Sequence, residues 1–130
     1  MPWATYTDPE VAHVGLSASE VAARGLATFR YDFADIDRAK LDGQTRGFVK
    51  IALDGRRIVS ATVVGEHAGE LLGAFNLAVT QRMSVQQLVD TVQPYPTRAD
   101  AIRRVGMEWA QGRLTPTIRG WLARFLAWRR

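Results

Sequence analysis

The residues with the clearest capacity for chemistry lie around a pair of prolines. Tyr95 stands between Pro94 and Pro96, and Asp100 follows five residues later. Prolines on both sides restrict the backbone strongly, so the phenol is held in place. Each of the two X–Pro peptide bonds can adopt the cis form. Tyrosine has an ordinary pKa of about 10, so at neutral pH it donates a hydrogen bond or a proton and is a poor general base compared with histidine. The pattern predicts either a positioned proton donor or a turn tyrosine whose ring packs over the edge of the core.

The remaining polar residues indicate no metal site, thiol centre or nucleotide-binding loop. Cysteine is absent, which excludes a thiol redox centre, a disulfide and a cysteine-based zinc site within this chain. The two histidines, His13 and His67, lack a second ligand at the separations typical of zinc. With Glu66 and Glu70 beside it, His67 is better explained as part of a solvated helix start. The sequence has no Gly-x-Gly-x-x-Gly fingerprint and no Gly-x-x-x-x-Gly-Lys phosphate loop, so flavin and nicotinamide sites are expected outside this chain.

Hydrophobic periodicity predicts the strands that would position these residues. Alternating or β-branched runs bounded by turn residues occur at residues 3–7, 27–33, 48–53 and 58–64. The last two runs flank Asp54-Gly55, a dipeptide that favours a tight hairpin. Residues 35–46 are polar and turn-rich, and they predict a loop or an irregular helical turn.

Capping residues and a helical period predict the helices. Ser17 and Glu20 form a capping box that opens a short helix, which Gly25 is expected to close in a left-handed conformation. After residue 65, an apolar stripe with helical spacing indicates a longer helix. The stripe consists of Ala68, Leu71, Leu72, Phe75 and Val79. Further helices are predicted at residues 84–90, opened by a second capping box, and at 98–111 and 116–128, capped by Thr97 and Thr115.

Together these elements predict an α+β fold. Strands come first and helices later, so we expect one antiparallel β-sheet with helices packed on one face, plus a C-terminal amphipathic helix. The 130 residues, with 47% hydrophobic and 23% charged side chains, suit one domain with a sizeable core. We expect residues 1–114 to form that domain and residues 115–130 a basic amphipathic tail. No membrane-spanning run or signal peptide is apparent, so the cytoplasm is the default expected location.

The C-terminal part of the chain carries the excess positive charge. The net charge is +4, and from Arg98 onward eight arginines face only two acidic residues. Apolar residues recur at helical spacing in the tail, at positions 118, 121, 122, 125 and 126. Such a helix is able to lie on an anionic membrane surface, or to dock on its own domain or on a second subunit. A solvated basic face that binds nothing is a further alternative, and nucleic acid is not expected because no recognition motif accompanies the charge.

Several short motifs, in their order and spacing, resemble the C-terminal dimerisation domain of the FAD-dependent pyridine nucleotide-disulfide oxidoreductases. In chain order they are Thr7-Asp8-Pro9-Glu10, Val14-Gly15, Gly47-Phe48-Val49-Lys50, Gly65-Glu66-His67-Ala68-Gly69-Glu70-Leu71 and Tyr95-Pro96-Thr97. The resemblance runs from about Trp3 to Gln111. The family includes dihydrolipoamide dehydrogenase, glutathione reductase and mercuric reductase. The resemblance implies a homodimer, with FAD and NAD(P)H bound by domains that are missing from this chain.

By position, the resemblance places Tyr95 where the family has its catalytic histidine and Asp100 where it has a glutamate. In the family, the histidine projects into the partner subunit's active site and exchanges a proton with a dithiol pair, and the glutamate orients it. Pro96 and Thr97 would then contact the cofactor across the dimer. Mercuric reductase is similar in having a tyrosine at this place, but it ends in a vicinal cysteine pair. This chain lacks that pair, which argues against mercury reduction.

The expected function is therefore that of an interface domain, either excised from a flavoprotein or the product of a truncated gene. Alone, such a domain would bind a copy of itself and catalyse nothing. An alternative of another class is a stand-alone interaction module whose basic tail binds an anionic membrane surface or a partner protein. A third hypothesis is a small enzyme that uses Tyr95 and Asp100 as a donor–carboxylate pair, but no nucleophile or cofactor site supports it.

Overall fold

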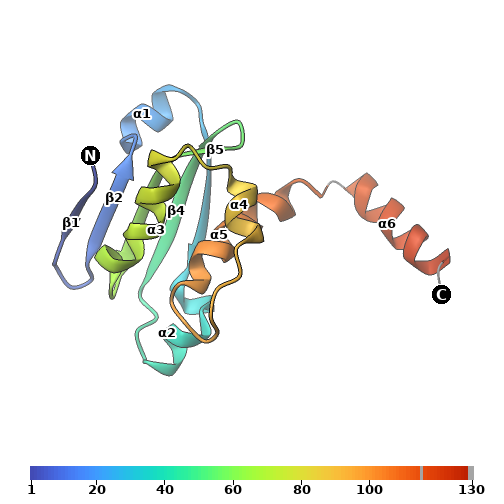
Figure 1. Cartoon of the computed structure of the whole chain (residues 1–130). Coiled ribbons are helices and arrows are strands. Elements are labelled where there is room, and N and C mark those ends of the chain that lie inside the picture. The colour runs from blue at the N-terminus through green and yellow to red at the C-terminus, as the bar shows by residue number, and fades with distance from the viewer. Residues whose placement is uncertain (115, 129–130) are drawn as a thin grey trace.

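One five-stranded antiparallel sheet forms the centre of the fold (Figure 1). The computed structural model describes residues 1–114 and 116–128. The strands are β1 Trp3–Thr5, β2 Val11–Gly15, β3 Ala27–Asp32, β4 Gly47–Asp54 and β5 Arg57–Gly65. They lie in the order β1-β2-β5-β4-β3, and every neighbouring pair is antiparallel. The antiparallel sheet predicted from the sequence is confirmed.

The helices of residues 68–80 and 100–112 cover one face of this sheet. The helices are α1 Ala18–Ala23, α2 Asp37–Leu41, α3 Ala68–Thr80, α4 Val85–Asp90, α5 Asp100–Gly112 and α6 Pro116–Trp128, and a 3-10 turn, η1, spans Phe33–Asp35. Figure 1 shows α3 lying over β5 and β2 and α5 over β4 and β3, with α4 packed against α5. The predicted α+β arrangement is therefore confirmed, and a helix is present in the tail as expected.

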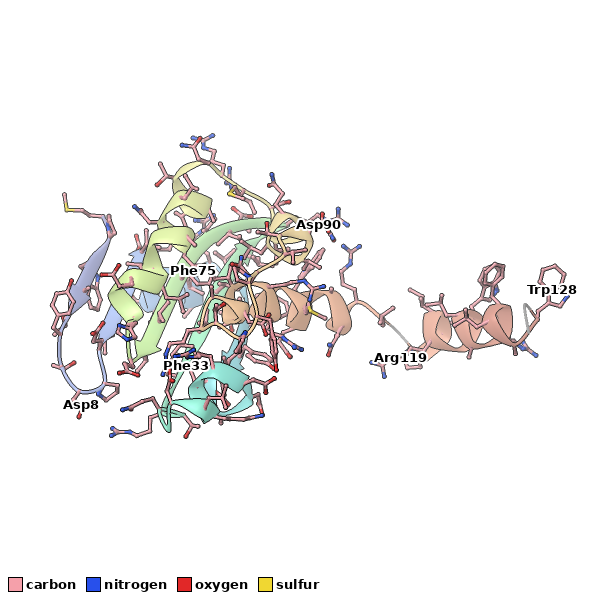
Figure 2. All side chains as sticks on the ribbon, turned by 60° about the horizontal axis from the view of Figure 1, so that its bottom comes forward. Asp8, Phe33, Phe75, Asp90, Arg119 and Trp128 are labelled. Atoms are coloured by element: carbon pink, nitrogen blue, oxygen red, sulfur yellow. The ribbon has the colours of Figure 1, made fainter. Side chains whose placement is uncertain are left out.

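The core lies between the sheet and these helices because the strands alternate. On β4, Val49 and Ile51 are buried toward the helices, whereas Lys50 between them is exposed on the other face. Phe33 and Phe75 are fully buried, and Figure 2 shows both in the interior of the domain. Burying one large apolar side chain stabilises a fold by roughly 1.5–3 kcal/mol. This shared interior is therefore the main source of stability, and it holds the loops at the edge of the sheet in place.

The N-terminal region departs from the sequence prediction. β1 ends at Thr5 rather than at residue 7, and the turn that follows contains a cis Asp8-Pro9 bond. The chain then returns as β2, which pairs with β1 on one side and β5 on the other. Ala12 and Val14 of β2 are buried. Because this run is short and one of its two inward residues is only an alanine, the sequence pattern does not predict the strand.

β4 and β5 form the predicted hairpin, with its turn one residue further on. Asp54 pairs with Arg57, so the turn consists of Gly55 and Arg56 rather than of Asp54-Gly55. Gly55 has φ +63°, which glycine adopts at no steric cost. A glycine at the first position of a two-residue turn matches the right-handed twist of the two strands.

The capping residues behave largely as predicted. Ser17 Oγ accepts a hydrogen bond from the backbone N–H of Glu20 at 3.2 Å, and Glu20 Oε2 accepts one from the backbone N–H of Ser17 at 2.7 Å. The helix ends before Gly25, which has φ +61° as expected. At the second box, Gln87 Oε1 accepts from the backbone N–H of Ser84 at 2.8 Å. The predicted cap at Thr115 lies outside the described residues.

Gly15→Ala is expected to lower the free energy of unfolding by about 3 kcal/mol. Gly15 has φ +88°, and a Cβ there would lie 2.1 Å from the carbonyl oxygen of Val59, so the methyl group meets both a left-handed backbone and a clash. Gly25→Ala is a matched control, because its φ is also positive but no heavy atom lies within 4 Å of the new Cβ. The control should lose only about 1 kcal/mol. Urea unfolding measures both losses, and equal losses would contradict the close approach of β2 to β5.

Candidate functional site

Tyr95 lies in the loop between α4 and α5, and its side chain projects into solvent. The Tyr95–Pro96 bond is cis. The hydroxyl of Thr97 donates a hydrogen bond to the carbonyl oxygen of Pro94 at 2.6 Å, which closes the loop around the tyrosine. The tyrosine is 73% exposed, so the ring does not pack over the edge of the core. The structure thus presents the phenol on a closed surface loop, where a group from outside this domain is able to reach it.

Thr97 is not the cap of α5, contrary to the sequence prediction. The helix begins at Asp100 instead of Arg98, and no side chain caps it. The turn before it is closed by bonds between residues three apart, from the N–H of Asp100 to the carbonyl of Thr97 (3.3 Å) and from that of Ala101 to that of Arg98 (3.1 Å). The Thr97 hydroxyl stabilises the loop rather than the start of the helix, because it donates its hydrogen bond to the carbonyl oxygen of Pro94.

The phenol of Tyr95 has a carboxylate partner from a distant part of the chain. Its Oη donates a hydrogen bond to Oδ2 of Asp37 at 2.9 Å, and the two residues are 58 positions apart. Asp37 is the first residue of α2, which follows η1 in the segment that the sequence predicts to be a loop or an irregular helical turn. The negative charge of Asp37 is favourable at the start of a helix. The fold therefore brings α2 up to the tyrosine loop, and the sequence pattern gives no signal for this contact.

This hydrogen bond separates the pKa values of the two groups. The hydrogen bond to Asp37 and the negative charge of that carboxylate raise the pKa of the Tyr95 phenol. The hydrogen bond from Tyr95 lowers the pKa of the Asp37 carboxyl in turn. Across neutral pH the pair therefore consists of a protonated phenol and an ionised carboxylate. Such a pair holds a proton at one defined atom, Tyr95 Oη.

Asp100, the carboxylate that the sequence places with Tyr95, has a different partner. Its Oδ2 lies 3.0 Å from Nε of Arg104, one turn further along α5. The charge of Asp100 still contributes, as a minor cause, to the raised pKa of Tyr95. The structure thus pairs Asp37 directly with the phenol and leaves Asp100 as a more distant charge.

A buried arginine anchors the loop from below. Arg98 is only 9% exposed, and its Nη2 lies 2.8 Å from Oε2 of Glu66 and 3.5 Å from Oδ2 of Asp42. Its Nη1 donates to the carbonyl oxygen of Gln44 at 3.4 Å, and its guanidinium lies 5.9 Å from the centre of the Phe33 ring. These contacts connect the tyrosine loop to the end of α2 and to the turn before α3. A charged residue is rarely buried unless it is paired, so the sequence alone gives no reason to expect this anchor.

A hollow of about 410 Å³ lies beside the loop. Its walls come from Arg38, Asp42, His67, Glu70, Leu71, Pro96, Thr97 and Arg98. Two of these, Pro96 and Thr97, are the residues that the resemblance assigns to a cofactor contact. Within residues 1–114 and 116–128, no cluster of three or more His, Cys, Asp or Glu side chains is placed to hold a metal ion.

Asp37→Asn is expected to lower the pKa of Tyr95 toward the ordinary value of about 10, because it removes the carboxylate charge that disfavours the phenolate. A raised pKa in the folded state means that the contribution of Tyr95 to stability is present below pH 10 or so and is lost as the pH rises through the folded-state pKa. For Asp37, whose pKa is lowered, the contribution is present above its ordinary pKa and is lost on acidification. An ultraviolet titration of the phenolate measures the first shift, with Tyr95→Phe subtracted to isolate this residue. An unchanged titration in Asp37→Asn would contradict the pairing.

The first 105 residues match a protein-family model described as pyridine nucleotide-disulphide oxidoreductase, dimerisation domain. The chain belongs to this family. It is 33% identical over 112 residues to dihydrolipoyl dehydrogenase 3 of Pseudomonas aeruginosa, covering 83% of this chain and 24% of that protein. It is 36% identical over 107 residues to the mercuric reductase of Acidithiobacillus ferrooxidans, covering 79% of this chain and 20% of that protein. The chain therefore spans a quarter or less of the length of these relatives.

Solved structures share the fold. LpdA from Mycobacterium tuberculosis superposes with a TM-score of 0.77 at 28% identity, over 82% of this chain and 24% of that chain. The HOCl-induced flavoprotein disulfide reductase RclA from Escherichia coli has the same TM-score at 18% identity, over 82% of this chain and 26% of that chain, and shows the fold alone. The family resemblance inferred from the sequence motifs is confirmed.

Proposed function

We propose that this domain pairs two subunits of an FAD- and NAD(P)H-dependent disulfide oxidoreductase-like flavoprotein and brings Tyr95 close to the redox site of the partner subunit. The observation that carries the proposal is the presentation of Tyr95, because a dimerisation-family domain holds an exposed phenol on a closed loop. FAD and NAD(P)H would bind to domains outside this chain, since the matched segment makes up only 24% and 20% of the two relatives. On its own the chain would bind a copy of itself without catalysing a reaction, and the cytoplasm is the location we expect.

In this arrangement Tyr95 would donate a proton rather than accept one. Asp37 holds the proton on Oη by accepting its hydrogen bond and by raising the pKa of the phenol. Asp37 would thus orient the phenol, and Asp100, paired with Arg104, would add a more distant negative charge. The flavin and dithiol of the full-length protein would supply electron transfer. Pro96 and Thr97 would contact the cofactor across the dimer, since both line the hollow beside the phenol.

The solution mass of the purified chain tests the pairing. Size-exclusion chromatography with light scattering across a dilution series is expected to give a dimer that resists dilution. Val92→Asp, near the start of the tyrosine loop, should weaken the dimer, because Val92 is 85% exposed and apolar and an interface would desolvate the new charge. Leu77→Asp is the control, because it places the same charge on another exposed apolar residue, in α3, where Leu77 is 59% exposed. It should leave the dimer intact. A full-length protein that stays monomeric at every concentration would contradict the proposal.

A further inference from the structure

Helix α6 presents a large apolar face to solvent. Trp121 and Trp128 are 75% and 83% exposed, and no described residue of the helix is buried. Figure 1 shows α6 projecting away from the sheet and its covering helices, and Figure 2 shows the same from a second direction, with Arg119 near its start and Trp128 near its far end. The structure therefore does not show the tail docked on its own domain, which is one of the alternatives that its sequence leaves open.

The apolar residues of α6 share one arc of the helix surface. At about 100° per residue, they fall within an arc of roughly 160°. The arc contains Ile118, Trp121, Leu122, Phe125, Leu126 and Trp128. Arg119 and Arg124 lie at its two opposite margins, and the back of the helix carries only small residues. An arginine at each margin is able to lay its aliphatic stem along an apolar surface while its guanidinium reaches polar groups above it.

The charge around this helix has one sign. Five arginines follow Glu108, and no acidic residue does. An anionic partner surface would compensate these arginines when the apolar arc is covered. Thirteen helical residues span about 20 Å, which is shorter than a bilayer core, and none of the helices in the described part of the chain is suited in length and apolarity to cross a membrane. The helix has the features of one that lies in the plane of a membrane surface.

We propose that α6 binds an anionic lipid surface. The apolar arc enters the boundary between headgroups and acyl chains, the two tryptophans sit at that boundary, and Arg119 and Arg124 contact the anionic headgroups. The tryptophan ring suits this place because it has an apolar body and a polar N–H. The proposal goes beyond the pairing of subunits and does not rest on it, since α6 carries the contact whether the domain is a monomer or a dimer.

Vesicle flotation with the 130-residue chain tests this proposal. The chain is expected to float with vesicles of phosphatidylcholine mixed with phosphatidylserine, and added salt should release it from them. With vesicles of phosphatidylcholine alone, the chain should remain unbound at the bottom of the gradient. Arg119→Gln with Arg124→Gln should weaken partitioning roughly 30-fold, because each arginine near an anionic surface contributes about fivefold. Glutamine is nearly as good a helix former as arginine, so this loss would not come from unfolding of the helix.

Two further variants separate the contributions of the apolar arc and of net charge. Trp121→Ala with Trp128→Ala should weaken partitioning by about 30-fold or more, although alanine raises helix propensity. Arg24→Gln with Arg57→Gln removes the same charge from the exposed surface of the domain and should leave partitioning unchanged. Equal binding to both vesicle types, or equal binding by the wild type and the α6 variants, would overturn the proposal. Loss of a dimer on removal of residues 115–130, without vesicle binding by the intact chain, would assign the helix to a second copy and also overturn it.

Discussion

Replacing Phe33 with alanine is expected to lower the free energy of unfolding by about 4 kcal/mol. The ring is fully buried at the start of η1, directly after β3. It packs so closely on Gly65 that a Cβ at that glycine would lie 2.4 Å from Phe33 Cε2. The guanidinium of Arg98 lies above the same ring. Alanine would leave a cavity among the turn before α3, the η1 segment and the arginine that anchors the tyrosine loop. Closing this cavity would require these three parts of the structure to shift together.

The loss should also be visible at the candidate site. Phe33 begins the η1 turn that leads into α2 and so to Asp37, and a loosened η1 would lengthen the hydrogen bond from Tyr95. The pKa of Tyr95 should then fall toward its ordinary value. Urea unfolding measures the stability, and an ultraviolet titration under native conditions measures the phenol.

Phe48→Ala is the control for this substitution. Phe48 lies on the opposite face of the sheet, where it is only half-buried and carries Arg30 at 3.9 Å above its ring. It should cost clearly less than Phe33→Ala and leave the Tyr95 titration unchanged. An equal cost for the two phenylalanines, or a shift of the Tyr95 pKa in both, would show that Phe33 has no special place under the loop.

Strong local signals explain the part of the fold that the sequence predicts. β4 and β5 are β-branched runs joined by a turn that contains a glycine, and α3 carries an apolar stripe that begins after residue 65. Each of these elements is therefore determined mainly by its own residues. The Ser17 box works for the same reason, since both partners lie within one turn of each other. β2 lacks such a signal. It is held by its ladders to two neighbours, and only the assembled sheet makes it a strand.

The candidate site depends on contacts between distant residues, which local patterns do not contain. Tyr95 stands out in the sequence because of its prolines, but its partner Asp37 lies in a polar segment where no side chain caps the short helix. Arg98 looks like an ordinary helix-start residue, although the fold buries it between Glu66 and Asp42. The resemblance to the family points instead to Asp100, because a comparison of sequences matches residues by their position along the chain. The structure adds a second carboxylate that approaches the phenol through space.

Tyr95→Phe is expected to slow turnover of the full-length flavoprotein that contains this domain by about a hundredfold or more, within the usual range for loss of a general acid. Phenylalanine keeps the ring and removes only the hydroxyl that donates to Asp37. The tyrosine is exposed and its loop is closed by Thr97 rather than by the phenol, so the domain should fold and pair as before. Light scattering and urea unfolding check that it does.

Tyr6→Phe is the matched control, because Tyr6 is 80% exposed and lies outside the tyrosine loop. It should leave the rate unchanged.

The pH profile separates a proton donor from a residue that only fills space. Because the pKa of Tyr95 is raised, the wild-type rate should hold through neutral pH and fall only as the phenol ionises. Asp37→Asn should move this alkaline limb to lower pH, and Asp100→Asn should move it less, since the Asp100 charge is the smaller cause. A Tyr95→Phe enzyme with the wild-type rate and profile would remove the proton-donor role while leaving the pairing of subunits intact.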